Sequence, residues 1–365
     1  PTGGLLVLPP EERRVSVVDG FREHLDAASR LPFLPDSRLR ASARSTDLQH
    51  AVRVAVLAGD GLRNLRSNAI SLIRRVAASV RHISSKINSL MPPSVAWISG
   101  RVNTAFIGVL SDALRWLDTS LVERFVYGFP CVGIIPDSGV YRPIVPPVSA
   151  AVVAERYAAF AATAPAWMRL QRQKLERHRV ASPAVAAADL AVSVKTRKEL
   201  SKGAVRGPFT SVAALTDSLT TAYPNMPAHT TPRALGRFGV PQKGDIRTID
   251  DGKGNGANRA TYLVETIASP TFAFPAVVAR AVFVAAAAAG LPMPPMVSSL
   301  ADLMMAYRTI PTSQPWYTSV AFFNPIPAGG ASPRVEYYYL PGHNFGLTAA
   351  VVNFNRYPEL VVVAA

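Results

Sequence analysis

The chain has 365 residues, of which 49% are apolar, enough for two domains or for one domain with a large extension. Lys and Arg outnumber Asp and Glu by 39 to 24, giving a formal net charge of +15. This charge favours a polyanionic partner, either nucleic acid or an anionic membrane, or else reflects only a basic solvated surface. The single cysteine, Cys131, excludes an intrachain disulfide and a cysteine zinc site, and the histidines show no metal-ligand spacing.

Neither a secretory signal nor a membrane span is predicted. No apolar stretch follows a basic start at the N-terminus, as a signal peptide requires. The most apolar window, residues 272–297, is broken by Arg280, Gly290 and prolines, whereas a span needs roughly 20 consecutive apolar residues. We therefore expect an intracellular protein, cytoplasmic or nuclear, with no membrane partner. Because the chain begins at Pro1 without methionine and stops in a β-branched run, we also interpret it as a fragment of a longer reading frame.

Residues 1–126 are predicted to form a basic, mostly helical region. From residue 47 to residue 90 apolar residues recur in steps of three and four, and Met91-Pro92-Pro93 ends this pattern. The arginines of this stretch indicate either a basic helix that follows a phosphate backbone or an amphipathic core helix with a solvated basic face. A second helical stretch is expected over residues 97–125.

Two segments lie between this region and the strands. Residues 127–150 are rich in proline and glycine and are predicted to connect two domains. Residues 151–232 are predicted to be helical and basic. After residue 233 short strands alternate with helices, so the whole pattern predicts an α+β fold. We expect a helix over residues 280–289 and a strand pair formed by residues 315–323 and 335–340.

A basic β-hairpin is predicted within "RFGVPQKGDIRTIDDGKGNGAN", residues 237–258. Its two strands flank a Lys-Gly turn and carry Arg237, Lys243 and Arg247. Cations on a hairpin suit a triphosphate, because Arg and Lys neutralise phosphate charge during phosphoryl transfer. A surface hairpin that binds no ligand would have the same pattern.

The stretch "SSLADLMMAYRTIP", residues 298–311, contains one carboxylate, Asp302, in an apolar run. A buried carboxylate is costly unless it is paired or binds a metal, and Mg²⁺ prefers carboxylate and phosphate oxygens. Asp302 is therefore a candidate metal ligand, or else a residue that only caps the following turn. In "HNFGLTAAVVNFNRYPEL", residues 343–360, a turn at Gly346 opens a helix of small residues. This helix either lets the backbone approach a ligand closely or is an ordinary core helix.

In this order, "KGDIRTIDDGKGNGAN", "ADLMMAYRTIP" and "FGLTAAVVNFNR" resemble the catalytic core of reverse transcriptases, most of all those of LTR-type and DIRS-like retroelements. That family has a Lys-Gly-x-x-Arg hairpin, then Asp-Leu-x-x-Ala-Tyr, then Phe-Gly-Leu-x-x-Ala with a later Phe-x-Arg. The resemblance covers residues 237–365, about a third of the chain. It implies that residues 233–365 form the fingers and part of the palm of a right-hand polymerase, a small antiparallel sheet with packed helices.

The resemblance also implies roles for residues of the second motif. Asp302 corresponds to the catalytic carboxylate that binds Mg²⁺, helped by the backbone carbonyl of Leu303. Tyr307 corresponds to the residue that closes against the 2′ position of the sugar. An aromatic ring there collides with a 2′-hydroxyl, so the enzyme would admit deoxynucleotides.

The first and third motifs would bind the nucleotide. Lys243 and Arg247 correspond to the triphosphate-binding pair of the fingers hairpin. Gly346 and the helix after it correspond to the element that positions template and nucleotide, and Phe345 and Arg356 match the same element.

The implied reaction is RNA-templated DNA synthesis by two-metal nucleotidyl transfer, with an RNA template, a DNA primer and dNTPs as partners and two Mg²⁺ ions in the complete enzyme. The family's other carboxylates, an Asp pair on a later hairpin, do not occur before Ala365. Asp250 and Asp251 match the fingers and cannot replace them, so we expect this fragment alone to be inactive. The alternatives are a viral RNA-dependent RNA polymerase, which usually has Asp at the offset of Tyr307, and a non-catalytic nucleic-acid-binding relic.

Overall fold

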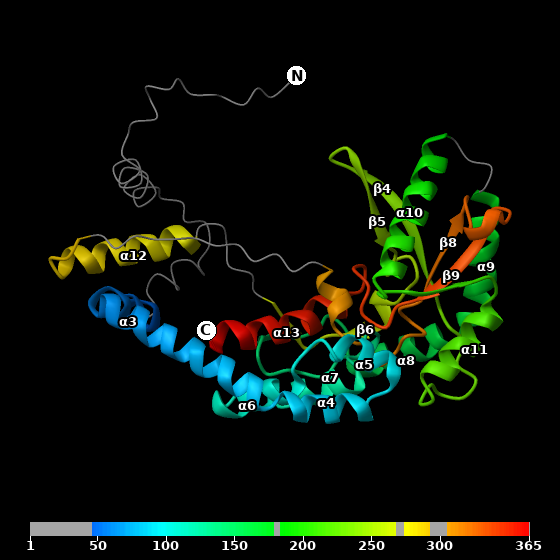
Figure 1. The fold of residues 1–365 in the computed structure, drawn as a ribbon. Coiled ribbons are helices and arrows are strands. Elements are labelled where there is room, and N and C mark those ends of the chain that lie inside the picture. Colours follow the sequence, from blue (N-terminus) through cyan, green and yellow to red (C-terminus); the bar gives the residue numbers. More distant parts are fainter. Residues whose placement is uncertain (1–45, 179–182, 268–273, 293–304, 365) are drawn as a thin grey trace, which may run out of the picture. The chain divides into compact units, whose positions relative to one another are not determined.

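The protein has an α+β fold, described by a computed structural model over residues 46–178, 183–267, 274–292 and 305–364. The chain divides into two compact units, whose helices and strands are labelled in Figure 1. Unit 1 contains residues 1–69 and 269–301, and unit 2 contains residues 70–268 and 302–365. The predicted α+β class is confirmed, since unit 2 combines small sheets with many helices. The expected antiparallel sheet is instead mixed, because residues 235–236 pair in parallel with residues 320–321.

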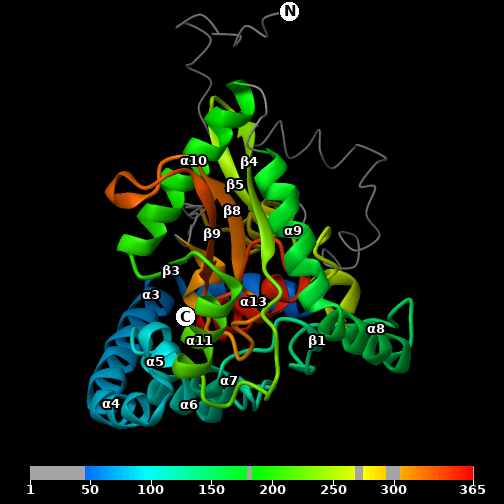
Figure 2. The ribbon, with the colours of Figure 1, turned by 90° about the vertical axis from the view of Figure 1, so that its right-hand side faces the viewer.

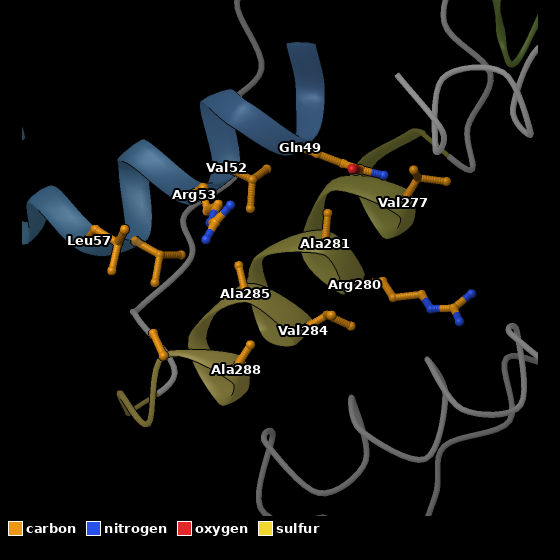
Figure 3. A pocket seen from close by; sticks show the side chains of 12 residues that line it. Gln49, Val52, Arg53, Leu57, Val277, Arg280, Ala281, Val284, Ala285 and Ala288 are labelled. Atoms are coloured by element: carbon orange, nitrogen blue, oxygen red, sulfur yellow. The ribbon is translucent and has the colours of Figure 1, made fainter. Parts of the chain in front are cut away.

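Two helices make up the described part of unit 1. They are the first part of α3 (Thr46–Ser79), which bends at Gly59, and α12 (Phe274–Ala288). Val52 and Val56 of α3 pack against Ala286 of α12. Beside this contact the two helices line an apolar groove of about 740 Å³ (Figure 3). The helix expected over residues 280–289 is confirmed by α12.

Short helices precede the sheet in unit 2. The end at Met91-Pro92-Pro93 is confirmed, because the helix before it stops at Leu90. The helix expected over residues 97–125 is interrupted twice. One interruption has a clear cause: the side chain of Asn103 accepts a hydrogen bond from the Phe106 amide and caps a new helix. The helices are α4 (Arg81–Leu90), α5 (Pro93–Ser99), α6 (Thr104–Ala113) and α7 (Leu121–Tyr127).

The composition of residues 127–150 had predicted a connection between two domains. In the structure these residues pack into unit 2 instead. Phe129, Cys131 and Val132 are at most 1% exposed. The backbone of this segment also pairs with a distant segment, because β1 (Gly133–Ile134) lies parallel to β6 (Thr261–Tyr262) and β2 (Arg142–Pro143) antiparallel to β7 (Glu265–Thr266). The apolar residues at the start of this segment thus belong to the core, whereas Ile144 and Val145 near its end are exposed.

A five-stranded sheet with the order β3-β9-β8-β4-β5 forms the centre of unit 2. The predicted hairpin is confirmed, since β4 and β5 are antiparallel and Gln242 lies opposite Asp245 at the turn. The predicted pairing of residues 315–323 with residues 335–340 is confirmed from Val320 onward by antiparallel β8 and β9, whereas residues 315–319 lie outside the strand. The strands are β3 (Arg206–Phe209), β4 (Leu235–Gln242), β5 (Asp245–Asp250), β8 (Val320–Asn324) and β9 (Arg334–Tyr339).

Helices cover this sheet. Figure 2 shows the sheet between α10, which packs against β4, β5 and β8, and α9, which packs against β8 and β9. No helix in the described ranges is long and apolar enough to cross a membrane. The helices of this part are α8 (Ala150–Ala162), α9 (Ala164–His178), α10 (Pro183–Ser201), α11 (Val212–Ala222) and α13 (Thr348–Ala364).

A buried ion pair connects α13 to the segment before α7. Arg356 Nε and Nη2 each donate to an oxygen of the Asp118 carboxylate over 2.6 Å, and Nη2 also donates to Ser120 Oγ over 2.7 Å. The side chains of Arg356 and Asp118 are 0% and 1% exposed. Because neither charge reaches water, each depends on the other for its stabilisation.

We expect the substitution Arg356→Met to lower the free energy of unfolding by about 3–5 kcal/mol, because it leaves Asp118 buried without its cation. Adding Asp118→Asn should recover much of this loss. Urea unfolding followed by circular dichroism measures both effects. The matched control is Arg172→Met, whose ion pair with Glu176 is about half exposed (52% and 51%). A loss no larger than that of the control would contradict the expectation.

Candidate functional site

The tip of the β4–β5 hairpin carries two exposed cations, Lys243 and Arg247, and extends beyond the neighbouring strands (Figure 1). Lys243 and Gly244 have positive φ angles of 49° and 79°, as a two-residue hairpin turn of the mirror-image type requires. Lys195 of α10 supports the hairpin, since its Nζ lies 2.7 Å from Asp245 Oδ2. Both predicted phosphate-binding side chains are therefore accessible to a ligand in solution.

The buried carboxylate of Asp250 lies at the base of this hairpin and joins three segments. Its oxygens accept hydrogen bonds from Arg237 Nε (2.7 Å), from Arg308 Nη2 (3.0 Å) and from Asn344 Nδ2 (3.1 Å). Burial alone would raise the pKa of Asp250, but the charges of Arg237 and Arg308 hold the pKa well below its usual value. Asp250 is therefore a structural anion.

A second acid completes this network. Glu199 of α10 accepts from Arg237 Nη1 over 2.7 Å and from Arg308 Nε over 3.3 Å. Two arginines thus face two carboxylates, which balances the buried charge. The sequence had grouped Arg237 with Lys243 and Arg247 as a phosphate-binding cation, but its side chain is 0% exposed. The reason is strand alternation, which turns Arg237 toward α10 and Arg247 toward the other face of the hairpin.

The network brings the second and third sequence motifs together. The rings of Tyr307 and Phe345 lie 4.8 Å apart, and the ring of Phe354 lies 5.6 Å from that of Tyr307. The backbone amide of His343 donates to the carbonyl of Tyr307 over 3.0 Å. Tyr307 is half-buried and Phe345 is 45% exposed, so the ring pair forms part of an accessible surface.

Gly346 lies in direct backbone contact with the end of the hairpin. A Cβ at Gly346 would overlap the carbonyl oxygen of Asp250, and a Cβ at Gly252 would overlap the carbonyl oxygen of Gly346. Asn258 reinforces the contact, since its Nδ2 donates to Gly346 O (3.0 Å) and its Oδ1 accepts from Thr348 N (2.9 Å). The close approach expected at Gly346 is therefore found, with the protein's own backbone as partner.

Among the predicted site residues, two lie outside the described part of the chain and one is committed elsewhere. Asp302 and Leu303 lie outside the described residues. Arg356 is committed to Asp118 in a buried pair, so its guanidinium is not available to a nucleotide. Among the described residues no group of three His, Cys, Asp or Glu side chains could hold a metal ion. Since the arginines and Asn344 occupy the Asp250 carboxylate, the described carboxylates do not by themselves form a Mg²⁺ site.

Sequence reasoning missed the residues that assemble the site. Arg308 directly follows Tyr307, and Asn344 directly precedes Phe345. The sequence motifs nevertheless indicated no role for Arg308 or for Asn344. One signal was present: counting outward from the Lys-Gly turn places Arg237 opposite Asp250, which indicates a cross-strand ion pair. No comparable signal in the sequence identified Glu199 as the second carboxylate that pairs with Arg237.

Comparison with protein-family models, with curated proteins and with solved structures gave no match to this chain.

The contact at Gly346 should be intolerant of a side chain. We expect Gly346→Ala to lower the free energy of unfolding by about 3 kcal/mol, because its Cβ displaces the Asp250 backbone. Gly108→Ala in α6 is the control, since its Cβ would lie an ordinary 3.6 Å from Val122 Cγ2. Thermal unfolding of both variants makes the comparison, and equal melting temperatures would refute the expectation.

His343 lies beside this site as a buried neutral imidazole. It is 0% exposed, and its ring lies edge-on to Phe129 with centroids 6.4 Å apart. The Nδ2 of Asn353 lies 3.1 Å from His343 Nε2. Burial lowers the pKa of His343 from 6.5 to about 4, because a charged ring would lose its hydration.

This shift predicts a pH dependence of stability. Between pH 6.5 and about pH 4 the unfolded chain binds a proton at His343 that the folded chain does not, so folding weakens as the pH falls. The contribution is roughly 3 kcal/mol and changes little below pH 4. Urea midpoints measured across this range should fall less in His343→Gln than in the unchanged protein. Parallel profiles would show that His343 does not carry the dependence.

Proposed function

We propose that this chain belongs to a nucleotidyltransferase that synthesises DNA on an RNA template, and that it forms the fingers and part of the palm of a polymerase of the reverse-transcriptase type. The observation that carries the proposal is the convergence of the three motifs on Asp250. Their order in the sequence suggested a shared site, and in the fold their residues touch one another.

Each accessible side chain has a task in this proposal. Lys243 and Arg247 neutralise the triphosphate from the hairpin. The ring of Tyr307, supported by Phe345, forms the wall against which the 2′ carbon of the sugar packs. The backbone of Gly346, fixed against Asp250, holds the start of α13 next to this wall.

The carboxylate of Asp302 and the carbonyl of Leu303 would hold Mg²⁺. The ion supplies charge stabilisation at the transferring phosphoryl group, and two such ions act in the complete enzyme.

Tyr307 provides the sharpest test of the proposal. In the protein translated from the complete reading frame, Tyr307→Val should lower the preference for deoxynucleotides over ribonucleotides about tenfold or more, because it removes the wall beside the 2′ position. Primer extension on an RNA template measures incorporation of both. Tyr127→Val is the control, since Tyr127 lies 63% exposed at the end of α7, outside this site.

Three results would contradict the proposal. A preference of the unchanged protein for ribonucleotides would indicate an RNA-dependent RNA polymerase. Synthesis that survives Asp302→Asn would show that Asp302 is not the catalytic carboxylate, and absence of synthesis together with RNA binding would indicate a non-catalytic relic.

A further inference from the structure

A second basic surface of unit 2 lies where α5 approaches the end of α10. A groove of about 670 Å³ is lined there by α5, by residues 202–204, by residues 305–310 and by α13. Among the described side chains that line it, Arg101, Lys202 and Arg308 are cationic and none is acidic. Aromatic rings, including Trp97 and Tyr357, form much of the remaining wall.

Trp97 is the centre of this surface. The guanidinium carbon of Arg206 lies 4.8 Å from the indole centroid, and that of Arg101 lies 5.4 Å from it. Gly203, with φ +70°, lies so close that a Cβ there would overlap the indole ring. The backbone therefore fixes the ring, and the ring in turn orients both arginines.

The two stacked arginines have no acidic partner among the residues that the structure describes. Arg206 Nη1 donates to the carbonyl of Gly203 over 2.9 Å, and Arg101 is exposed. When the flat face of a guanidinium lies over an indole ring, its N–H groups point outward in the guanidinium plane. They can then donate hydrogen bonds to another acceptor. Their planar fork matches the oxygens of a phosphate. Arg308 differs, because Glu199 and Asp250 already occupy its donors.

We propose that this groove binds a single-stranded nucleic acid, with Arg101 and Arg206 contacting successive phosphates and Trp97 holding both arginines in place. A chain of phosphates is complementary to a groove that has cations and no acids, and aromatic walls suit unstacked bases. The flat surface of an anionic membrane would fit the concave groove less well. Most of the residues that line the groove lie outside residues 237–365, so the sequence motifs did not predict it.

This inference deepens the proposed function and depends on it only for the role of the bound strand as template. The binding step itself requires neither nucleotide nor metal. It can therefore be measured when no synthesis occurs, and the two proposals can fail independently.

The probe is a fluorescein-labelled oligouridylate of about 20 nucleotides, long enough to cover one such site. Fluorescence anisotropy is recorded in EDTA over a series of salt concentrations. We expect Arg101→Gln with Arg206→Gln to weaken binding about tenfold or more, and to reduce the slope of log K against log salt by about 1.4, the value for two lost phosphate contacts on a single strand. The control is Arg172→Gln in α9, which removes one positive charge outside the groove. This variant should alter the affinity less than about twofold.

Equal affinities of the double variant and the control would overturn the inference. So would binding to phosphatidylserine vesicles in the absence of binding to the oligonucleotide. The single change Arg101→Gln, at an exposed side chain, gives the same test if the double variant does not fold, with an expected slope change of about 0.7. If primer extension proceeds and both variants bind RNA normally, this inference fails while the proposed function stands.

Discussion

The structure of unit 2 depends on keeping the Asp250 carboxylate charged in a place that water does not reach. An isolated charge there would cost several kcal/mol, so the fold must supply cations and donors from whichever segments come near. It does so from β4, from the turn after Met305 and from the segment before α13. Asp250 thereby fixes the distances between three stretches that are far apart in the sequence.

Strand alternation explains why only some of the hairpin's cations belong to this network. A two-residue turn at Lys243 and Gly244 fixes the register, and the register places Arg237 directly opposite Asp250. Arg247 lies opposite Val240, on the other face. One hairpin thus provides a buried cation that stabilises the fold and keeps its other cations exposed. This division could be predicted from the sequence, because turn length and a period of two determine it.

The remaining partners could not be predicted in this way. Arg308 and Asn344 lie 58 and 94 positions after Asp250, and Arg356 lies 238 positions after Asp118. No periodicity connects residues at such separations, and each pairing exists only because packed helices and strands bring the segments together. The same limit explains residues 127–150, whose composition resembles a linker although their backbone pairs with strands much later in the chain.

Arg308 lies between the two surfaces of unit 2. Its Nη1 donates to the His343 carbonyl over 2.8 Å, its Nη2 to Asp250 and its Nε to Glu199. Turning these donors toward a phosphate would break hydrogen bonds to buried acceptors, which costs more than an exposed phosphate contact returns. The Arg308 side chain is therefore held in place. It lies over the ring of Phe345 and also lines the groove beside Trp97. Unlike Arg308, the exposed side chains of Lys243, Arg247 and Arg101 and the half-buried side chain of Arg206 have no buried acid as a partner among the described residues.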